Sequence, residues 1–201
     1  MIVLITEPEF RADESQLLNR MLEKHPELLV HIRKPGAEIE ETGQLLRQIS
    51  PEYYPRLVLH QQHELLQHFP LKGIHLTTAD RENHPEKNAI STSFHTLSEA
   101  VKQQENYQYF FCSPVFPSIS KPGYHSLENW TISQQETNFR KKAVALGGIN
   151  SGRLSQVFKI GFRNVALLGA VWQHPNPVQA IDHLYSAYSR TIITFDASDQ
   201  L

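Results

Sequence analysis

The sequence predicts a single closed (β/α)8 barrel, the TIM-barrel architecture of the α/β class. The chain has 201 residues, which is near the lower limit for such a barrel and enough for one hydrophobic core. Short apolar runs rich in β-branched and aromatic residues recur along the chain, each followed by a polar, glycine or proline residue. Most runs precede a segment with helical spacing of its apolar residues, and this alternation favours a parallel sheet closed into a barrel.

The apolar runs are the predicted strands. They span residues 2–6, 28–33, 56–60, 73–76, 89–93, 109–113, 143–147 and 164–169. Near-continuous apolar strands are buried on both faces, as parallel strands are. The spacing alone also fits a doubly wound sheet, but no Gly-x-Gly-x-x-Gly follows the first run, which disfavours a dinucleotide-binding fold.

The predicted helices lie between these strands. Apolar residues fall on one helical face in segments 17–22, 45–49, 98–104, 154–160 and 178–188. The segment after Leu76 is polar and is expected to be a loop. Residues 1–190 form the barrel domain, and residues 191–201 form a C-terminal tail. This tail is interpreted as either an added edge strand or a poorly ordered end.

Composition narrows the function classes. The chain has 19 basic and 21 acidic side chains, a net charge of −2, which disfavours nucleic acid or an anionic membrane as partner. No apolar run is long enough to span a bilayer, and no positive segment precedes the first apolar run as in a signal peptide. Cys112 is the one cysteine, which fits a cytoplasmic protein without an internal disulfide. A homo-oligomer is left open.

Glycines end the last two predicted strands. Gly147 and Gly148 follow the seventh strand, and Gly169 follows the eighth. Loops at these two places are the common phosphate site of barrels, because glycine lets backbone N–H groups approach an anion closely. The alternative interpretation is that these glycines only permit tight turns.

Polar residues after the second and sixth strands suit an anion. Arg33 ends the second strand and could bind phosphate through two hydrogen bonds, or could be a solvated rim residue. Ser118, Ser120 and Lys121 follow the sixth strand and offer two hydroxyls beside one positive charge. Serine, proline and lysine are also common in plain surface loops.

Four segments, read in order, resemble the thiamin phosphate synthase/TenI family. They are His31-Ile32-Arg33, Gly73-Ile74-His75-Leu76, the run 113–121, and Ala145-Leu146-Gly147-Gly148-Ile149. The resemblance covers residues 1–188, and it implies a (β/α)8 barrel. The family's synthases join hydroxymethylpyrimidine diphosphate to thiazole phosphate and release pyrophosphate with Mg2+. The TenI branch includes enzymes that tautomerise a thiazole phosphate carboxylate.

The resemblance also implies roles for individual residues. Arg33, Ser118, Ser120 and Lys121 fall where the synthases contact pyrophosphate, and Gly148 falls where they bind the thiazole phosphate. Asp80 falls where an aspartate helps to hold Mg2+.

The sequence departs from the synthases in several places. The synthase motif Gln-Leu-Arg-Glu-Lys is His31-Ile32-Arg33-Lys34-Pro35 here, so the second cation is shifted by one residue or lost. Adjacent strand residues point to opposite faces, so Lys34 would not replace that cation if the strand continues. The third strand ends His60-Gln61 instead of Asn-Asp, so one Mg2+ carboxylate is absent. A serine near the end of the eighth strand is Gly169, and the tautomerase histidine is Pro114.

Histidines follow several neighbouring strands. His31, His60 and His75 are at or near the ends of the second, third and fourth strands, and His95 follows the fifth. Histidines at neighbouring strand ends assemble metal sites in barrel hydrolases. The chain has 11 histidines, so clustering of some of them at strand ends is expected by chance. The favoured interpretation is therefore not a metal site but one or two histidines at the mouth that bind substrate or transfer protons near neutral pH.

Three functions follow as hypotheses. The first is a thiamin biosynthesis transferase that couples the pyrimidine diphosphate to thiazole phosphate, in which Arg33, Lys121 and the two serines stabilise the departing pyrophosphate. The second is a TenI-like thiazole tautomerase with His31 or His60 as proton carrier. The third is a non-catalytic barrel that binds thiazole or thiamin phosphate, as the loss of part of the Mg2+ site would suggest.

Overall fold

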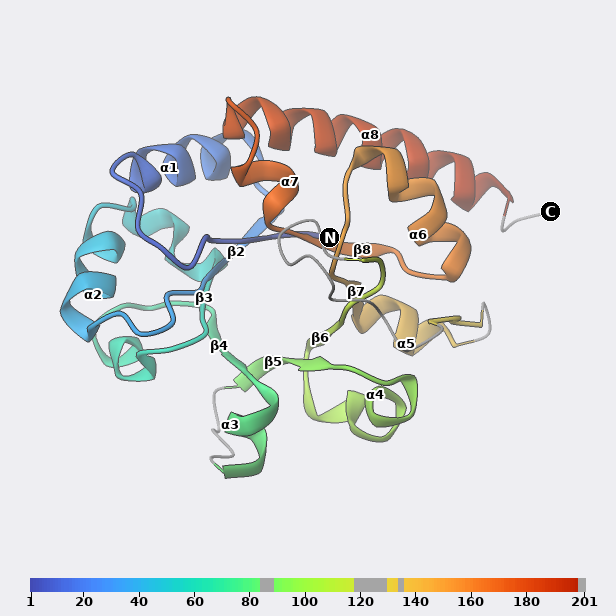
Figure 1. Cartoon of the computed structure of the whole chain (residues 1–201), viewed down its shortest axis with the longest axis horizontal. Helices are drawn as coiled ribbons and strands as arrows, with labels where there is room; N and C mark the ends of the chain where they lie inside the picture. Colours follow the sequence, from blue (N-terminus) through green and yellow to red (C-terminus); the bar gives the residue numbers. More distant parts are fainter. Residues whose placement is uncertain (84–88, 118–129, 134–135, 199–201) are drawn as a thin grey trace.

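The computed structural model describes residues 1–83, 89–117, 130–133 and 136–198 of the chain. Eight parallel strands close into one barrel in the order β1 to β8, each hydrogen-bonded to its sequence neighbours (Figure 1). The strands are β1 (Ile2–Ile5), β2 (Leu28–Ile32), β3 (Leu57–Leu59), β4 (Gly73–Leu76), β5 (Ala89–Phe94), β6 (Tyr109–Cys112), β7 (Ala143–Ala145) and β8 (Asn164–Leu167). The predicted fold is confirmed, and the predicted strand ends differ by at most two residues.

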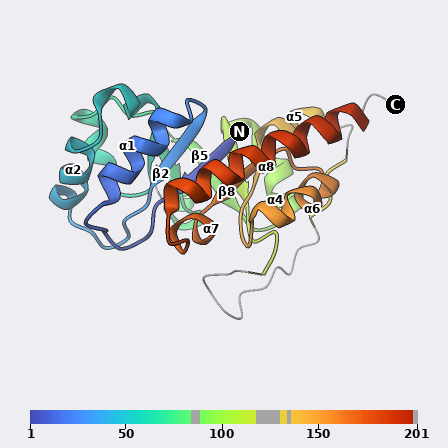
Figure 2. The same ribbon diagram turned by 90° about the horizontal axis from the view of Figure 1, so that it is seen from above.

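Helices surround the barrel in the ring seen in Figure 1. The α-helices are α1 (Glu14–Lys24), α2 (Ile39–Arg47), α3 (Thr78–Asn83), α4 (Leu97–Gln103), α5 (Thr137–Lys142), α6 (Leu154–Ile160), α7 (Gly169–Trp172) and α8 (Pro177–Ser198). Short 3-10 helices are η1 (Pro51–Arg56), η2 (His63–Gln67), η3 (Gln104–Asn106) and η4 (Ser151–Arg153). The long helix α8 packs against α1, α6 and α7; it runs along the top of the molecule in Figure 1 and crosses the face turned toward the viewer in Figure 2.

Local sequence explains where these helices start and stop. Helix α2 begins with a capping box in which Glu38 and Glu41 bond each other's backbone N–H groups. Thr96 caps α4 by accepting a hydrogen bond from the backbone N–H of Glu99. Helix α6 ends at Gly161, whose φ of 116° is in the left-handed region that glycine tolerates.

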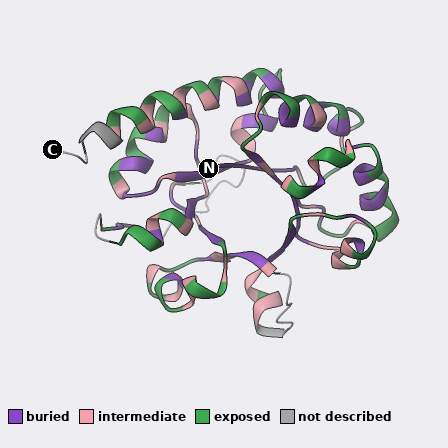
Figure 3. Ribbon diagram, turned by 180° about the vertical axis from the view of Figure 1, so that it is seen from behind, coloured by how far each residue is buried: buried purple, intermediate pink, exposed green. Residues whose placement is uncertain are grey.

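Strand residues alternate between the barrel interior and the helix layer. The larger hydrophobic cluster lies between the strands and the helices. Figure 3 shows the buried residues in purple, along the strands and on parts of the surrounding helices. The smaller cluster consists of strand residues only and fills the interior: Val3, Ile5, Val58, Ile90, Tyr109, Phe111, Val144 and Ala166. By the same alternation, His31 and His75 point inward and are buried. The register between β4 and β5 shifts by one residue at Ile74/His75, so Ser91 faces inward as well as its neighbour Ile90.

Two expectations about secondary structure are wrong. The polar segment after Leu76 forms helix α3, because the Asp80 carboxylate accepts hydrogen bonds from the Thr77 backbone N–H and hydroxyl. Of the two interpretations of the tail after residue 190, the edge strand is wrong, because residues 191–198 continue helix α8 to Ser198. Ile192 and Phe195 pack against the core there, and the Phe195 ring lies 5.6 Å from that of Phe158.

Among the described residues, no helix combines the length and the apolar character needed to cross a bilayer.

Candidate functional site at the barrel mouth

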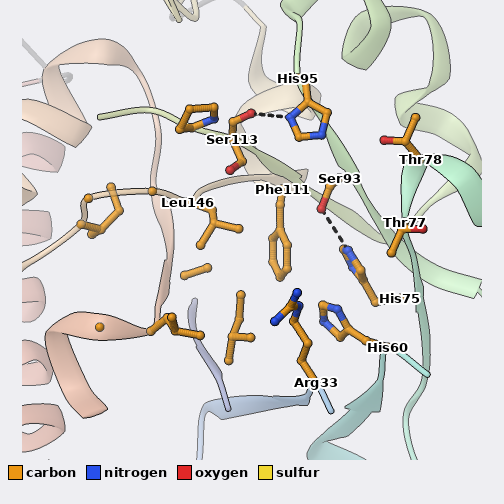
Figure 4. Close-up of a pocket in the computed structure, with 18 of the residues that line it drawn as sticks. Arg33, His60, His75, Thr77, Thr78, Ser93, His95, Phe111, Ser113 and Leu146 are labelled. Carbon is orange, nitrogen blue, oxygen red and sulfur yellow. Dashed lines mark hydrogen bonds between the residues drawn. The ribbon is translucent and has the colours of Figure 1, made fainter. Parts of the chain in front are cut away.

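A cavity of about 490 Å³ opens at the carboxyl ends of the strands. Arg33, His60, His75 and Phe111 line it together with hydroxyl-bearing residues from the β4 and β5 ends (Figure 4). Opposite them, the loops after β7 and β8 contribute glycines and apolar side chains. The described lining contains one guanidinium and no carboxylate, so the cavity suits an anionic ligand.

Arg33 presents its guanidinium to the cavity without a competing partner. It follows β2 immediately, and its backbone N–H donates to Thr6 Oγ1 at 2.9 Å. Among the described residues, no side chain or carbonyl forms a hydrogen bond or ion pair with its guanidinium. An arginine in this state can bind a phosphate through two parallel hydrogen bonds.

Lys34 is turned away from the cavity and is fully buried. Its Nζ lies 2.8 Å from both carboxylate oxygens of Glu14 and donates to the carbonyls of Glu7 and Glu9. The side chains of Lys34 and Glu14 are 0% and 1% exposed. Lys34 is therefore committed to holding the β1–α1 loop, and it supplies no charge to the mouth.

Gly147 and Gly148 after β7, and Gly169 and Ala170 after β8, line the cavity. Gly147 and Gly148 have φ of 102° and 63°, a conformation that side-chain-bearing residues rarely adopt. A Cβ atom on Gly148 would lie 2.5 Å from the Pro117 carbonyl oxygen, so backbone geometry already requires glycine there. Within the described structure, the amides of Gly148, Gly169 and Ala170 donate no backbone hydrogen bond. No described acceptor therefore competes with an anion for these three amides.

Three histidines meet inside the barrel beneath the cavity. The Nδ1 atom of His31 lies 2.8 Å from Nε2 of His60, and the Nε2 atom of His31 lies 2.6 Å from the Tyr109 hydroxyl. The rings of His60 and His75 stack, with their centroids 4.2 Å apart. The His75 ring nitrogens bond Ser91 Oγ at 2.9 Å and Ser93 Oγ at 3.0 Å.

Burial keeps these imidazoles neutral. It lowers the pKa of His75 to about 3; the negative charge of Asp80 opposes this shift, and the positive charges of Arg81 and Arg33 add to it. Burial also lowers the pKa of His31 and of His60 well below the usual value, and repulsion from the neighbouring rings adds to it. At neutral pH each ring therefore has one N–H donor and one lone pair.

The other residues expected in the site either lie away from the cavity lining or fall outside the described residues. Asp80 is engaged by Thr77 and is not among the residues that line the cavity. Ser118, Ser120 and Lys121, expected to contact pyrophosphate, lie outside the described residues. The structure brings Arg33, His60, Gly147, Gly148 and Gly169 to one cavity, and His31 lies just below it.

Sequence reasoning missed the polar residues that support the histidines. Tyr109 and Ser91 are inward residues of β6 and β5, and Ser93 is the next inward residue of β5. Inward polar residues in otherwise apolar barrel strands were the available signal. The pairing itself was not visible, because His31 and Tyr109 are 78 positions apart in sequence.

Comparisons with known proteins agree with this architecture. The family model described as "Thiamine monophosphate synthase" (TMP-TENI) matches residues 2–171. The chain is 23% identical over 172 residues to thiamine-phosphate synthase of Parasynechococcus marenigrum, covering 81% of this chain and 49% of that protein. It is 29% identical over 125 residues to the thiamine biosynthesis bifunctional protein ThiED of Geobacter sulfurreducens, covering 59% of this chain and 26% of that protein.

Solved structures give the same result. The crystal structure of thiamine phosphate pyrophosphorylase from Bacteroides thetaiotaomicron superposes with a TM-score of 0.75 and 27% identity, covering 95% of this chain and 96% of that one. The corresponding Pyrococcus furiosus protein, at 21% identity and a TM-score of 0.68, supports the fold. Because the family model covers most of the sequence, the chain belongs to the thiamine monophosphate synthase family.

Proposed function

We propose that the protein is a thiamin biosynthesis enzyme that binds thiazole phosphate at the barrel mouth and couples it to hydroxymethylpyrimidine diphosphate. The observation that carries this proposal is the arrangement of anion-binding groups around one cavity. The Arg33 guanidinium lies after β2, and the amides of Gly148, Gly169 and Ala170 lie across the mouth; among the described residues none of these groups has a hydrogen-bond partner. Two anionic groups can therefore be held at opposite sides of the same cavity.

The chemistry assigned to these groups is electrostatic. The amides after β7 and β8 hold the thiazole phosphate, as backbone N–H groups do at phosphate sites of barrels. Arg33 stabilises the negative charge that develops on pyrophosphate as the bond to the pyrimidine methylene breaks. The thiazole nitrogen then forms the new bond to that carbon. Lys121, Ser118 and Ser120 are proposed to assist on the pyrophosphate side.

The described residues do not fit the Mg2+ that the family uses. Mg2+ prefers carboxylate and phosphate oxygens. The β3 end offers His60 and Gln61, and Gln61 Oε1 already accepts a hydrogen bond from the Lys34 backbone N–H. Asp80 is occupied by Thr77 and is not part of the described cavity lining. No step of the proposed reaction is therefore assigned to Mg2+.

A thiazole tautomerase is the second candidate, and the neutral imidazoles favour it. Moving a proton between carbon atoms needs a neutral base near the substrate, and His60 and His75 line the cavity. In His60, Nε2 is hydrogen-bonded to His31, whereas Nδ1 has no hydrogen-bond partner in the described structure. In this reaction His60 would accept the proton, and His31 and Tyr109 would orient its ring.

One experiment separates the candidates. The protein is incubated with hydroxymethylpyrimidine diphosphate, thiazole phosphate and Mg2+, and thiamin phosphate and pyrophosphate are measured. Formation of both products supports the coupling reaction. If neither forms, an assay with the thiazole phosphate carboxylate tests the tautomerase. Tight thiazole phosphate binding without either reaction would identify a binding protein. We also propose a cytoplasmic location, which the buried free thiol of Cys112 fits.

A further inference from the structure

The histidine cluster beneath the cavity has the donor set of a metal centre. His31, His60 and His75 come from the ends of three neighbouring strands, and one ring nitrogen of each lies within 4.8 Å of the others. The three residues are 0%, 5% and 2% exposed. Three converging imidazoles at the ends of neighbouring strands are a recurrent way of binding a transition ion.

The outer partners orient the ring nitrogens inward. The Tyr109 hydroxyl lies 2.6 Å from His31 Nε2, and Ser91 Oγ lies 2.9 Å from His75 Nδ1. If each of these ring nitrogens carries the proton, its N–H donates to an oxygen and leaves the lone pair on the other nitrogen. Metal-binding histidines are oriented in this way by oxygen acceptors behind the ring.

The inner nitrogens face one another. Nδ1 of His31 and Nε2 of His60 are 2.8 Å apart, so without an ion one of them must carry a proton between them. Nε2 of His75 lies on the cavity side, 3.0 Å from the Ser93 hydroxyl. A cation among these three nitrogens would take the place of the proton shared by His31 and His60 and of the Ser93 hydroxyl at His75. It would then accept one lone pair from each ring.

We propose that this cluster binds one divalent transition ion of the Zn2+ type through His31 Nδ1, His60 Nε2 and His75 Nε2. Ligand nitrogens about 2.0–2.1 Å from a tetrahedral ion are about 3.4 Å from each other. His31 Nδ1 and His60 Nε2 are 2.8 Å apart, and one ligand atom of each histidine lies within 4.8 Å of the others, so these distances bracket that value. Closing the site also requires the stacked His60 and His75 rings, now inclined by 21°, to rotate until their in-plane lone pairs converge on the ion. The inference is independent of the proposed coupling reaction.

The chemistry of the donors selects the class of ion. Imidazole nitrogens suit Zn2+, Co2+ and Ni2+, whereas Mg2+ needs oxygen ligands. With three protein ligands, the fourth position faces the cavity that His60 and His75 line. Arg33 lines the same cavity and repels a bare dication, so the ion should carry an anionic oxygen, such as hydroxide, in that position.

The test uses Co2+ as a spectroscopic probe on the full chain without an affinity tag. After chelator treatment, the protein is titrated with Co2+ and its visible absorption is recorded. The expected result is one equivalent per chain with the intense bands of a four-coordinate ion, and displacement of these bands by Zn2+. A weak octahedral spectrum, or no binding, would overturn the proposal on wild-type protein alone.

Variants locate the ion. His60→Asn and His75→Asn should weaken Co2+ binding at least about 100-fold, and His95→Asn, at the same mouth but outside the cluster, should not change it. Tyr109→Phe keeps the ring shape and removes only the hydroxyl behind His31, so about 10- to 100-fold weaker binding is expected. If the cluster variants and Tyr109→Phe bind Co2+ as tightly as wild type does, the ion lies elsewhere and the proposal is wrong.

Discussion

Replacing Arg33 with alanine removes the guanidinium that the coupling reaction is proposed to need most. Lys34 is fully buried against Glu14, so it does not compensate from the next position in the chain. Arg33 itself lines the cavity with no described partner, so its loss leaves no buried carboxylate unpaired. The expected defect is therefore in catalysis and not in folding.

The size of the effect follows from what the group does. Removing one hydrogen-bond donor from a preorganised anion site costs about 2.7–4 kcal/mol, and each 1.36 kcal/mol corresponds to tenfold in rate. Arg33→Ala should therefore slow pyrophosphate release by about 100- to 1000-fold. Arg33→Lys should recover only part of this, because an ammonium group cannot form the paired contact of a guanidinium.

The assay is single-turnover pyrophosphate release with both substrates, together with direct measurement of thiazole phosphate affinity. Affinity for thiazole phosphate should be nearly unchanged, since its phosphate is assigned to the opposite side of the mouth. Arg47→Ala is the matched control, because it removes the same charge from an exposed ion pair with Glu40 on α2. Full activity of Arg33→Ala in an active enzyme would show that Arg33 is a rim residue and would refute the assignment.

Three further predictions concern stability and the mouth. Lys34→Met should lower the free energy of unfolding, measured by urea denaturation, by about 3–5 kcal/mol, because it leaves the buried Glu14 carboxylate without its ion-pair partner. The control Lys24→Met removes a lysine from the exposed pair with Asp182 and should lower that free energy by no more than about 1 kcal/mol. Gly148→Val should destabilise the protein as well as weaken phosphate binding, because its Cβ would lie 2.5 Å from a carbonyl oxygen; an unchanged melting temperature would contradict this. Burial holds the pKa of His75 at about 3 against about 6.5 in the unfolded chain, so metal-free protein should lose about 2 kcal/mol through this group as pH falls from 7 to 5, and a His75→Asn variant should show a correspondingly shallower pH dependence.

The fold was predictable because each strand carries its own signal. Eight apolar runs ended by turn residues sufficed, since barrel strands are buried on both faces and need no partner information to be recognised. Helix α3 was missed because it is short, polar and held by the local contact of Asp80 with Thr77, which leaves no apolar periodicity. Beyond residue 190, β-branched residues suggested a strand, but packing of Phe195 on Phe158 extends α8.

Side-chain positions in the site were predictable only where they depend on the sequence pattern of a single strand. Arg33 and Lys34 directly follow β2 and still point to opposite sides, Arg33 to the cavity and Lys34 into the buried ion pair with Glu14, as the sequence pattern suggested. The partner of Lys34 was not predictable, because Glu14 belongs to a helix whose position depends on the whole β1–α1 loop. Likewise, the contact of His31 with Tyr109 depends on the closure of the barrel and on strand register.

The strand order divides the mouth into two chemically different halves, and this division makes the three functions distinguishable. The β7 and β8 side offers backbone amides, which are proposed to bind a phosphate of about two negative charges without any side-chain charge. The β2 to β4 side offers one guanidinium and neutral imidazoles, and its described lining residues include no carboxylate that would bring Mg2+ to a diphosphate. A coupling enzyme must use Arg33 heavily and tolerate His60→Asn in the pyrophosphate step. A tautomerase must show the reverse, losing turnover with His60→Asn while Arg33→Ala changes mainly the Michaelis constant. A binding protein would show neither effect, because thiazole phosphate affinity would depend on the glycine side alone.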